Sequence, residues 1–334
     1  MPTQPCLTKC ISGSQGGRHR LRLDLMSLAP NNFVFSQDVA RAMSQGLPIV
    51  ALESTIISHG LPSPRNVQVA GQIEDSVRQG GGVPATIAIL DGTVHVGLSR
   101  TQLEQLGDPA SQVVKVSTRD LGPVIAARGN GATTVSATSH IAHLAGIRFF
   151  ATGGLGGVHR GALTTWDESA DLVTLARTPI TVVCAGVKSI LDVAATVERL
   201  ETLGVTVVGY QTSSFPGFYR ADSGYAVPWR VDTVQEAAAL SAARDAIKAP
   251  GAVILAQSVA IADELDAQLH DDTLASGLAA ADAAQIHGKD VTPFLLEWFH
   301  TQTNNQSLEV NVTLINANAL LAAQVAVAAG QVTL

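Results

Sequence analysis

The stretch ITVVCAGVKSILDVAATVERLETLGVTVVG, residues 180–209, decides the fold of this chain. It opens with the apolar run Ile180–Ala185, which is typical of a strand buried on both faces. Apolar residues then recur at three- and four-residue spacing within Asp192–Gly204, as on one face of a helix, and the closing glycine is a helix stop signal. A second apolar run, Val205–Gly209, completes a strand–helix–strand unit, the building block of a parallel sheet.

Strand-like and helix-like segments alternate along most of the chain. Other short apolar runs predict strands at Pro48–Leu52, Ala85–Leu90, Val113–Val116, Ile147–Thr152 and Ala252–Ala256. Helices are predicted at Ser36–Gln45, Asn66–Gln79, Thr134–Leu144, Ser189–Leu203, Val234–Ile247 and Ser307–Ala328. This alternation predicts an α/β protein, with residues 31–334 forming one α/β/α layered domain around a mostly parallel central sheet.

Composition argues against several classes of protein. The chain has 334 residues, 46% of them hydrophobic and 15% charged, so it can bury a large core and is not disordered as a whole. Its net charge of −7 disfavours nucleic acid and anionic membranes as partners. The apolar segment Ala317–Leu334 is broken by polar residues and lacks the ~20 predominantly apolar residues of a membrane span. Three cysteines are too few for a disulfide framework and predict a reducing, cytoplasmic location.

The first 30 residues differ from the rest. Four basic residues occur before the first acid, Asp24, and no apolar segment of a secretory signal is present. We expect a disordered extension, or a start upstream of the true one at Met26, with organelle targeting as the alternative.

Polar residues and glycines cluster after the predicted strands, where open parallel sheets bind ligands. Glu53 ends a buried-looking strand, so desolvation would suit it to general-acid catalysis; capping a helix or pairing with a lysine is the alternative. Lys115 sits inside an apolar run and could bind phosphate or a carboxylate, unless it points to water from an edge strand.

A glycine-rich loop and an acidic segment follow. In Ala151–Gly161, backbone N–H groups could approach an anion, with His159 and Arg160 as further donors; a plain tight turn is the alternative. The segment Trp166–Leu172 has three carboxylates within five positions, the oxygen ligands that hard divalent cations prefer. The alternative is a helix N-terminus, where the macrodipole favours acids.

Lys188 follows an apolar strand and is expected to open a helix. Burial and the helix N-terminus would both lower its pKa, giving an amine able to form a Schiff base; a lysine that extends to water is the alternative. Cys184 is expected to be a small core residue. His140 and His143 are expected to be ordinary helix histidines. The loop Tyr210–Tyr219 is expected to cover the substrate, with an aromatic ring able to stack on a flat one.

Several long strings closely resemble the pseudouridine-5'-phosphate glycosidase family. They lie at Glu53–Pro62, Ala151–Arg160, Ser169–Leu172, Ala185–Asp192, Gly209–Thr212, Phe215–Tyr219 and Gly288–Leu296. Their order and spacing also match, from about Phe35 to the C-terminus.

This resemblance implies an enzyme that reversibly cleaves pseudouridine 5'-phosphate into uracil and ribose 5-phosphate. The bond is a C–C glycosidic bond, broken after the ribose ring opens and a lysine forms a Schiff-base adduct at the anomeric carbon. The resemblance further implies one Mn²⁺ per subunit, an α/β/α fold and a homotrimer.

The family's roles carry over by matching positions. Lys188 matches the nucleophile, Glu53 the proton donor and Asp167 the manganese ligand. The matched substrate-binding positions are Lys115, Val135, Ser169, Ala170 and Asp171. His159 and Asn311 also match substrate-binding positions, but less closely.

The sequence departs from the family pattern at a few positions, and two other functions are alternatives to the one that the resemblance implies. Glu168 replaces an apolar residue beside the metal position, Gly217 replaces a common alanine, and Asn316–Asn318 breaks a usual Asn-Asn pair. A Schiff-base aldolase or lyase acting on another phosphosugar would share Lys188, and a catalytically silent binder of sugar phosphates would show no turnover.

Overall fold

The computed structural model describes residues 33–286 and 288–332, so the predicted N-terminal extension lies outside the described part. Its strands form one sheet in the order β1-β4-β3-β2-β7-β8-β11-β9-β10, with β6 pairing β3 and β5 pairing β6. The strands are β1 (Phe33–Phe35), β2 (Ile49–Leu52), β3 (Val83–Leu90), β4 (Thr93–Val96), β5 (Val114–Val116), β6 (Gly131–Thr133), β7 (Phe149–Ala151), β8 (Thr181–Cys184), β9 (Thr206–Tyr210), β10 (Trp229–Val231) and β11 (Val253–Gln257).

The mostly parallel sheet is confirmed. All described strand pairs are parallel except those of β3 with β4 and with β6. The seven predicted strands are present, because each is a mostly apolar run. The sequence missed β1, β4, β6 and β10, which have only three or four residues each; β4, β6 and β10 also contain polar residues or glycine.

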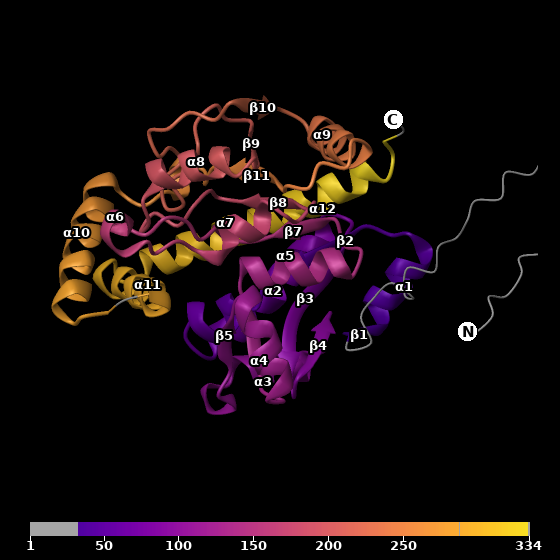
Figure 1. The fold of residues 1–334 in the computed structure, drawn as a ribbon, viewed down its shortest axis with the longest axis horizontal. Helices are drawn as coiled ribbons and strands as arrows, with labels where there is room; N and C mark the ends of the chain where they lie inside the picture. The colour runs from indigo at the N-terminus through magenta and orange to yellow at the C-terminus, as the bar shows by residue number, and fades with distance from the viewer. Residues whose placement is uncertain (1–32, 287, 333–334) are drawn as a thin grey trace, which may run out of the picture.

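Helices cover both faces of the sheet. The longer ones are α1 (Gln37–Gln45), α2 (Arg65–Gln79), α3 (Arg100–Gly107), α5 (Val135–Leu144), α8 (Val193–Thr202), α9 (Val234–Ala246), α10 (Ala267–Ala283), α11 (Val291–Gln302) and α12 (Gln306–Ala329). Shorter helices are α4 (Leu121–Ala126), α6 (Ala162–Thr165) and α7 (Ala170–Leu175). In Figure 1, α12 passes behind the sheet against β7 and β8, and α5 and α7 lie in front. The layers are therefore α/β/α, as predicted.

The closing helix α12 is a core element. Its length and hydropathy alone would allow it to cross a membrane, but 61% of its most apolar window is buried inside the molecule. It packs against α2, α9 and three strands. Its apolar character is therefore explained by burial on the sheet.

One predicted helix begins later than expected. The helix expected over Ser189–Leu203 is α8, which starts at Val193 with Asp192 as its N-cap, accepting a hydrogen bond from Ala195 N at 2.9 Å. Residues 185–192 form a loop after β8. Lys188 therefore does not open a helix, because the capping aspartate lies four residues further on and the helix starts after it, at Val193.

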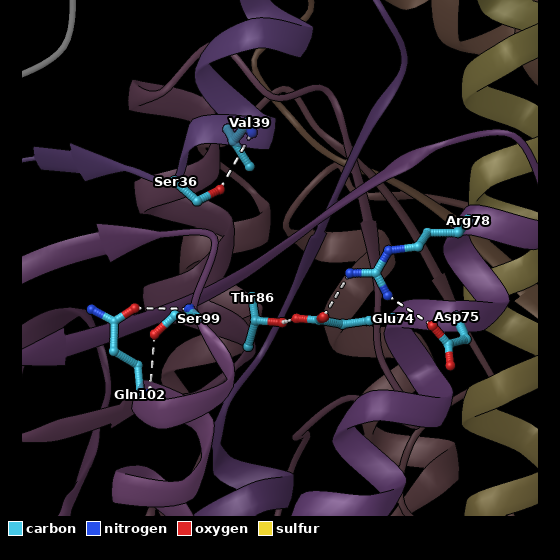
Figure 2. Close-up of polar contacts among 8 residues, drawn as sticks. All are labelled: Ser36, Val39, Glu74, Asp75, Arg78, Thr86, Ser99 and Gln102. Atoms are coloured by element: carbon cyan, nitrogen blue, oxygen red, sulfur yellow. Dashed lines mark hydrogen bonds and ion pairs between the residues drawn. The ribbon is translucent and has the colours of Figure 1, made fainter.

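Polar contacts hold the N-terminal elements together (Figure 2). The buried carboxylate of Glu74 on α2 accepts hydrogen bonds from Thr86 on β3 at 2.7 Å and from Arg78 at 3.0 Å. Ser36 and Ser99 cap α1 and α3. The Thr86–Glu74 hydrogen bond fixes α2 against β3, and β3 pairs with β2, the strand that Glu53 follows.

Candidate active site

A cavity of about 350 Å³ lies at the carboxyl ends of the strands, where the sequence predicted a site. Glu53 reaches it from the end of β2, Lys115 from β5 and Lys188 from the loop after β8. His159 and Asp167 line the same cavity. The fold thus brings together side chains from all five predicted segments.

A second, smaller cavity adjoins the first. The two share Glu53, Thr55, Lys115, Lys188 and Thr292 as lining residues. The second cavity adds apolar walls from Ile56, Phe218, Pro293 and Leu296. It also adds two polar side chains, His59 and Asn311. The charged residues therefore stand at the junction between a polar compartment and a more apolar one.

The carboxylate of Glu53 is held by two hydroxyl groups. Thr55 Oγ1 donates to its Oε2, and Thr152 Oγ1 donates to its Oε1. The two alternatives predicted for Glu53 were a helix cap and an ion pair with a lysine. Its described hydrogen bonds are with threonines, and it caps no described helix. Both oxygens keep a further lone pair for a ligand.

Lys115 points into the site. It lies on β5, where its neighbour Val114 is 47% exposed, so alternation turns the lysine inward. β5 pairs only with β6 among the described strands, yet its lysine does not point to water as an edge lysine usually does. Burial and the nearby Lys188 ammonium lower the pKa of Lys115, against the opposing effect of carboxylates that include Glu53.

The loop that carries Lys188 is fixed by backbone contacts. Lys188 N donates to Leu155 O at 3.1 Å, and Leu191 N donates to Lys188 O at 2.9 Å. Gly186 has φ +82°, and a Cβ there would lie 2.3 Å from Pro216 O, so only glycine fits. Cys184 is buried in the core as predicted, and burial raises its pKa to about 12.

The glycine-rich loop uses several of its N–H groups internally, which leaves fewer of them for the anion site that the sequence predicted. The N–H groups of Leu155, Gly156, Val158 and His159 are already taken by internal acceptors. Its glycines instead permit close packing: a Cβ at Gly156 would lie 2.3 Å from Ser169 Oγ. These four N–H groups are therefore not open to an anion, and anion binding by the rest of the loop stays a prediction.

Arg160 also departs from its predicted role. It lines a separate cleft and donates to Ser189 O at 3.4 Å. The preceding residue, His159, faces the catalytic cavity, so the two side chains point to different sides of the loop. Burial lowers the pKa of His159, against the opposing effect of Asp167, whose Oδ2 lies 3.8 Å from His159 Nδ1.

The acidic segment is not one helical face. Asp167 and Glu168 precede α7, whose N-cap is Ser169, so Asp167 and Asp171 do not share a helix surface. Glu168 pairs with Arg199 at 3.0 Å, which offsets the extra charge expected beside the metal position. Asp167 alone of the three presents a partly exposed carboxylate without a close hydrogen-bond donor.

Asp171 connects two parts of the site. Its Oδ1 accepts from Ser136 N on α5, and its Oδ2 accepts from Gly156 N in the glycine-rich loop, both at 2.8 Å. Ser169, Ala170 and Asp171 all line the cavity, as does Val135 at the start of α5. Their substrate contacts stay a prediction.

The second cavity contains Asn311, which is only 6% exposed. Its side-chain amide has no described hydrogen-bond partner, so it can donate and accept hydrogen bonds with polar atoms at the edge of a ligand. Of the predicted covering loop, Phe218 lines this cavity, whereas Phe215 and Tyr219 are core residues. The loop therefore packs inside the molecule and presents one ring.

The sequence also missed several site residues. Ser117 and Arg119 line the first cavity and follow Lys115 directly, and His59 lines the second within the string that begins at Glu53. Burial and the Lys115 charge lower the pKa of His59. Their closeness to the predicted residues was the available signal. His140 and His143 lie outside both cavities on α5, as expected of ordinary helix histidines.

An α/β/α fold with two lysines, a half-buried glutamate and a polar cavity defines an enzyme that acts on a small molecule. The family model for indigoidine synthase A-like proteins matches residues 38–328. The chain is 56% identical over 298 residues to a pseudouridine-5'-phosphate glycosidase of Streptomyces griseus subsp. griseus, covering 89% of this chain and 92% of that one. It is 55% identical over 292 residues to another from Salinispora tropica, covering 87% and 90%.

Solved structures show the same fold. The prealnumycin C-glycosynthase AlnA in complex with ribulose 5-phosphate matches with a TM-score of 0.83 and 35% identity, over 90% of this chain and 98% of that chain. An indigoidine synthase A-like protein from Thermotoga maritima matches with a TM-score of 0.80 and 33% identity, over 88% and 95%. The chain belongs to the pseudouridine-5'-phosphate glycosidase family of enzymes.

Proposed function

We propose that this enzyme reversibly cleaves pseudouridine 5'-phosphate into uracil and ribose 5-phosphate. The observation that carries the proposal is the junction of the two cavities at Glu53, Lys115 and Lys188. The polar cavity suits the sugar phosphate, with Arg119 and Ser117 as donors. The more apolar cavity suits a flat base, with Phe218 as a wall and Asn311 as a hydrogen-bonding group.

The bond to be cleaved then lies beside the lysines. In the proposed reaction the ribose ring opens as its C1–O4 bond breaks and the Lys188 amine forms a covalent bond to C1; O4 keeps the electron pair and takes the proton that the amine loses. When the C1–C5 bond breaks, its electron pair stays on uracil C5, which takes a proton from Glu53, and the nitrogen lone pair of Lys188 forms a C=N bond to C1. Water hydrolyses this imine, releasing ribose 5-phosphate and the free amine.

Lys115 supports the reaction as a cation. Its charge would attract the phosphate or an oxygen of the open-chain sugar. Because burial lowers the pKa of Lys115, this lysine is also the competing candidate for the nucleophile.

The proposed metal position fits a hard divalent cation held by few protein ligands. No group of three or more histidine, cysteine or acidic side chains that could hold a metal occurs among residues 33–286 and 288–332. Asp167 would therefore supply the protein carboxylate, with water and substrate oxygens as further ligands, as is common for such cations in phosphate sites. Mn²⁺ bound there would add positive charge beside the substrate.

Two further properties belong to the proposal: a homotrimer and a cytoplasmic location. Leu163 and Trp166 on the α6 turn are 97% and 84% exposed, which supports a role for this turn in a contact between subunits. Analytical ultracentrifugation would give a mass near three chains, and a monomer would contradict the trimer.

The reaction is tested in the synthetic direction. Uracil, ribose 5-phosphate and Mn²⁺ are incubated with the enzyme, and pseudouridine 5'-phosphate is sought by chromatography and mass spectrometry. Product that depends on uracil supports the proposal. Consumption of ribose 5-phosphate without uracil would indicate an aldolase or lyase acting on a phosphosugar, and binding without turnover would indicate a silent binder.

The nucleophile is tested by trapping. Ribose 5-phosphate is added with borohydride, and the modified lysine is identified by peptide mapping. We expect Lys188→Ala to abolish the adduct and Lys115→Ala to retain it at Lys188. The reverse pattern would assign the nucleophile to Lys115.

A further inference from the structure

We propose that Thr55 and Thr152 are positioning residues that hold the carboxylate of Glu53 in its catalytic orientation. Each hydroxyl donates to a different oxygen of the carboxylate: Thr55 to Oε2 and Thr152 to Oε1. The inference rests on the proposed function, in which Glu53 is the proton donor.

Thr152 is a rigid support behind the carboxylate. Its side chain is completely buried, and it follows β7 directly. Its N–H donates to Val183 O at 3.0 Å, and its carbonyl accepts from Asn318 Nδ2 at 2.9 Å. The central strand β8 and the core helix α12 therefore fix the backbone that carries this hydroxyl.

Thr55 approaches the carboxylate from the substrate side. It lines both cavities, whereas Thr152 lines neither. The two hydroxyls thus hold Glu53 from opposite parts of the site, one inside the core and one beside the ligand. When a proton binds at Oε2, the Thr55 hydroxyl can rotate to accept a hydrogen bond, while Thr152 still fixes Oε1.

The site needs such support because Glu53 has competing partners. A glutamate side chain rotates about three bonds, and both Lys115 and Lys188 line the same cavities as its carboxylate. Without the hydroxyls, the carboxylate could turn towards a lysine ammonium. The threonines keep it available for proton transfer at C5 of uracil, where misplacement by about 1 Å can cost about 100-fold in rate.

The test compares Thr152→Val and Thr55→Val with Thr152→Ser and Thr55→Ser. Valine keeps the shape of threonine and removes the hydroxyl, whereas serine keeps the hydroxyl. We expect each valine variant to lower kcat by about 10- to 100-fold, with KM for uracil and ribose 5-phosphate within about twofold, and each serine variant to restore most of kcat. Glu53→Gln sets the lower limit, at about 10²- to 10⁴-fold below wild type.

Thr181→Val is the matched control. Thr181 is a completely buried threonine on β8 whose hydroxyl contacts Ser241 Oγ at 2.8 Å and does not touch Glu53. We expect it to keep wild-type kcat. Full kcat in both other valine variants, or serine variants as impaired as the valine ones, would overturn the proposal.

Crystal structures of the ligand-free variants give a readout that does not depend on the reaction. The Glu53 carboxylate should leave its wild-type position in Thr152→Val and Thr55→Val, and keep it in Thr181→Val. A displaced carboxylate in an enzyme that makes no pseudouridine 5'-phosphate would refute the proposed function and leave the positioning role standing. An undisplaced carboxylate would refute the positioning role, whatever the reaction.

Discussion

Three acids that are neighbours in sequence have three different environments. Asp167 faces the cavity, Glu168 pairs with Arg199, and Asp171 accepts two backbone N–H groups. A carboxylate whose lone pairs and charge are already compensated gains less from a cation than an open one. At the scale of single residues, Asp167 is therefore the carboxylate for which we propose a metal role.

Replacement of Asp167 by alanine should remove the response of the enzyme to Mn²⁺. Direct binding is measured by the fall in the electron paramagnetic resonance signal of free Mn²⁺ on adding protein. We expect wild type to bind and Asp167→Ala to bind at least about tenfold more weakly. Glu168→Gln should keep binding, because that carboxylate is already paired with Arg199. Equal Mn²⁺ affinity in wild type and Asp167→Ala would reject the assignment.

At the scale of elements, the glycines of the glycine-rich loop allow neighbouring elements to pack closely against it. A Cβ at Gly157 would lie 2.3 Å from Thr196 Oγ1 on α8, and one at Gly154 would lie 2.6 Å from the Phe218 ring. The loop therefore lies directly against the elements that flank the Lys188 loop and the second cavity. Small residues are needed there because the backbones and side chains approach so closely.

Gly157→Ala should destabilise the enzyme by about 1–3 kcal/mol through overpacking. Gly122→Ala is the matched control: a Cβ at this position on α4 would have no neighbour within 4 Å. Because alanine favours helix over glycine, that variant should be unchanged or more stable by up to about 1 kcal/mol. Urea unfolding at neutral pH measures both. A Gly157→Ala midpoint equal to wild type would show that the loop can relax around the added methyl group.

At the scale of the whole molecule, buried histidines link folding to pH. His270 and His300 are 8% and 4% exposed, and burial lowers the pKa of each, against the opposing effects of Asp271 and Glu297. His59, His95, His140 and His159 have pKa values lowered by the same main cause. The unfolded chain therefore binds more protons than the folded chain below the unfolded value of 6.5.

Stability should accordingly fall as the pH drops below about 6.5 towards the lowered folded-state values, and the buried histidines His270 and His300 should each contribute at most about 1.4 kcal/mol per pH unit. At pH values above about 6.5, the stabilising contribution of the neutral histidines is fully present. Urea unfolding of wild type at pH 7.5 and 5.5 measures the loss, and the double variant His270→Gln/His300→Gln should show a smaller one. An identical loss in the double variant would mean that other groups control the pH dependence.

The sequence alone predicted the parallel sheet and most of the segments that form the site. Buried parallel strands are continuous apolar runs, and their carboxyl ends gather at one edge of a sheet. Glu53, Lys115 and Lys188 each follow or lie in such a run, so local sequence was enough to place them together. Cys184 was likewise recognisable as a core residue within its strand.

The tertiary structure decided what each polar group at that edge contacts. In the glycine-rich loop, two of the N–H groups that were predicted to approach an anion instead bind Asp171 and Thr196, 15 and 38 residues further along the chain. Lys115 faces the first cavity, and Arg160 lines a separate cleft. Glu53 accepts a hydrogen bond from the hydroxyl of Thr152, which lies 99 residues further along the chain. Hydrogen-bond partners and side-chain directions depend on contacts between distant segments, and these exist only once the chain has folded.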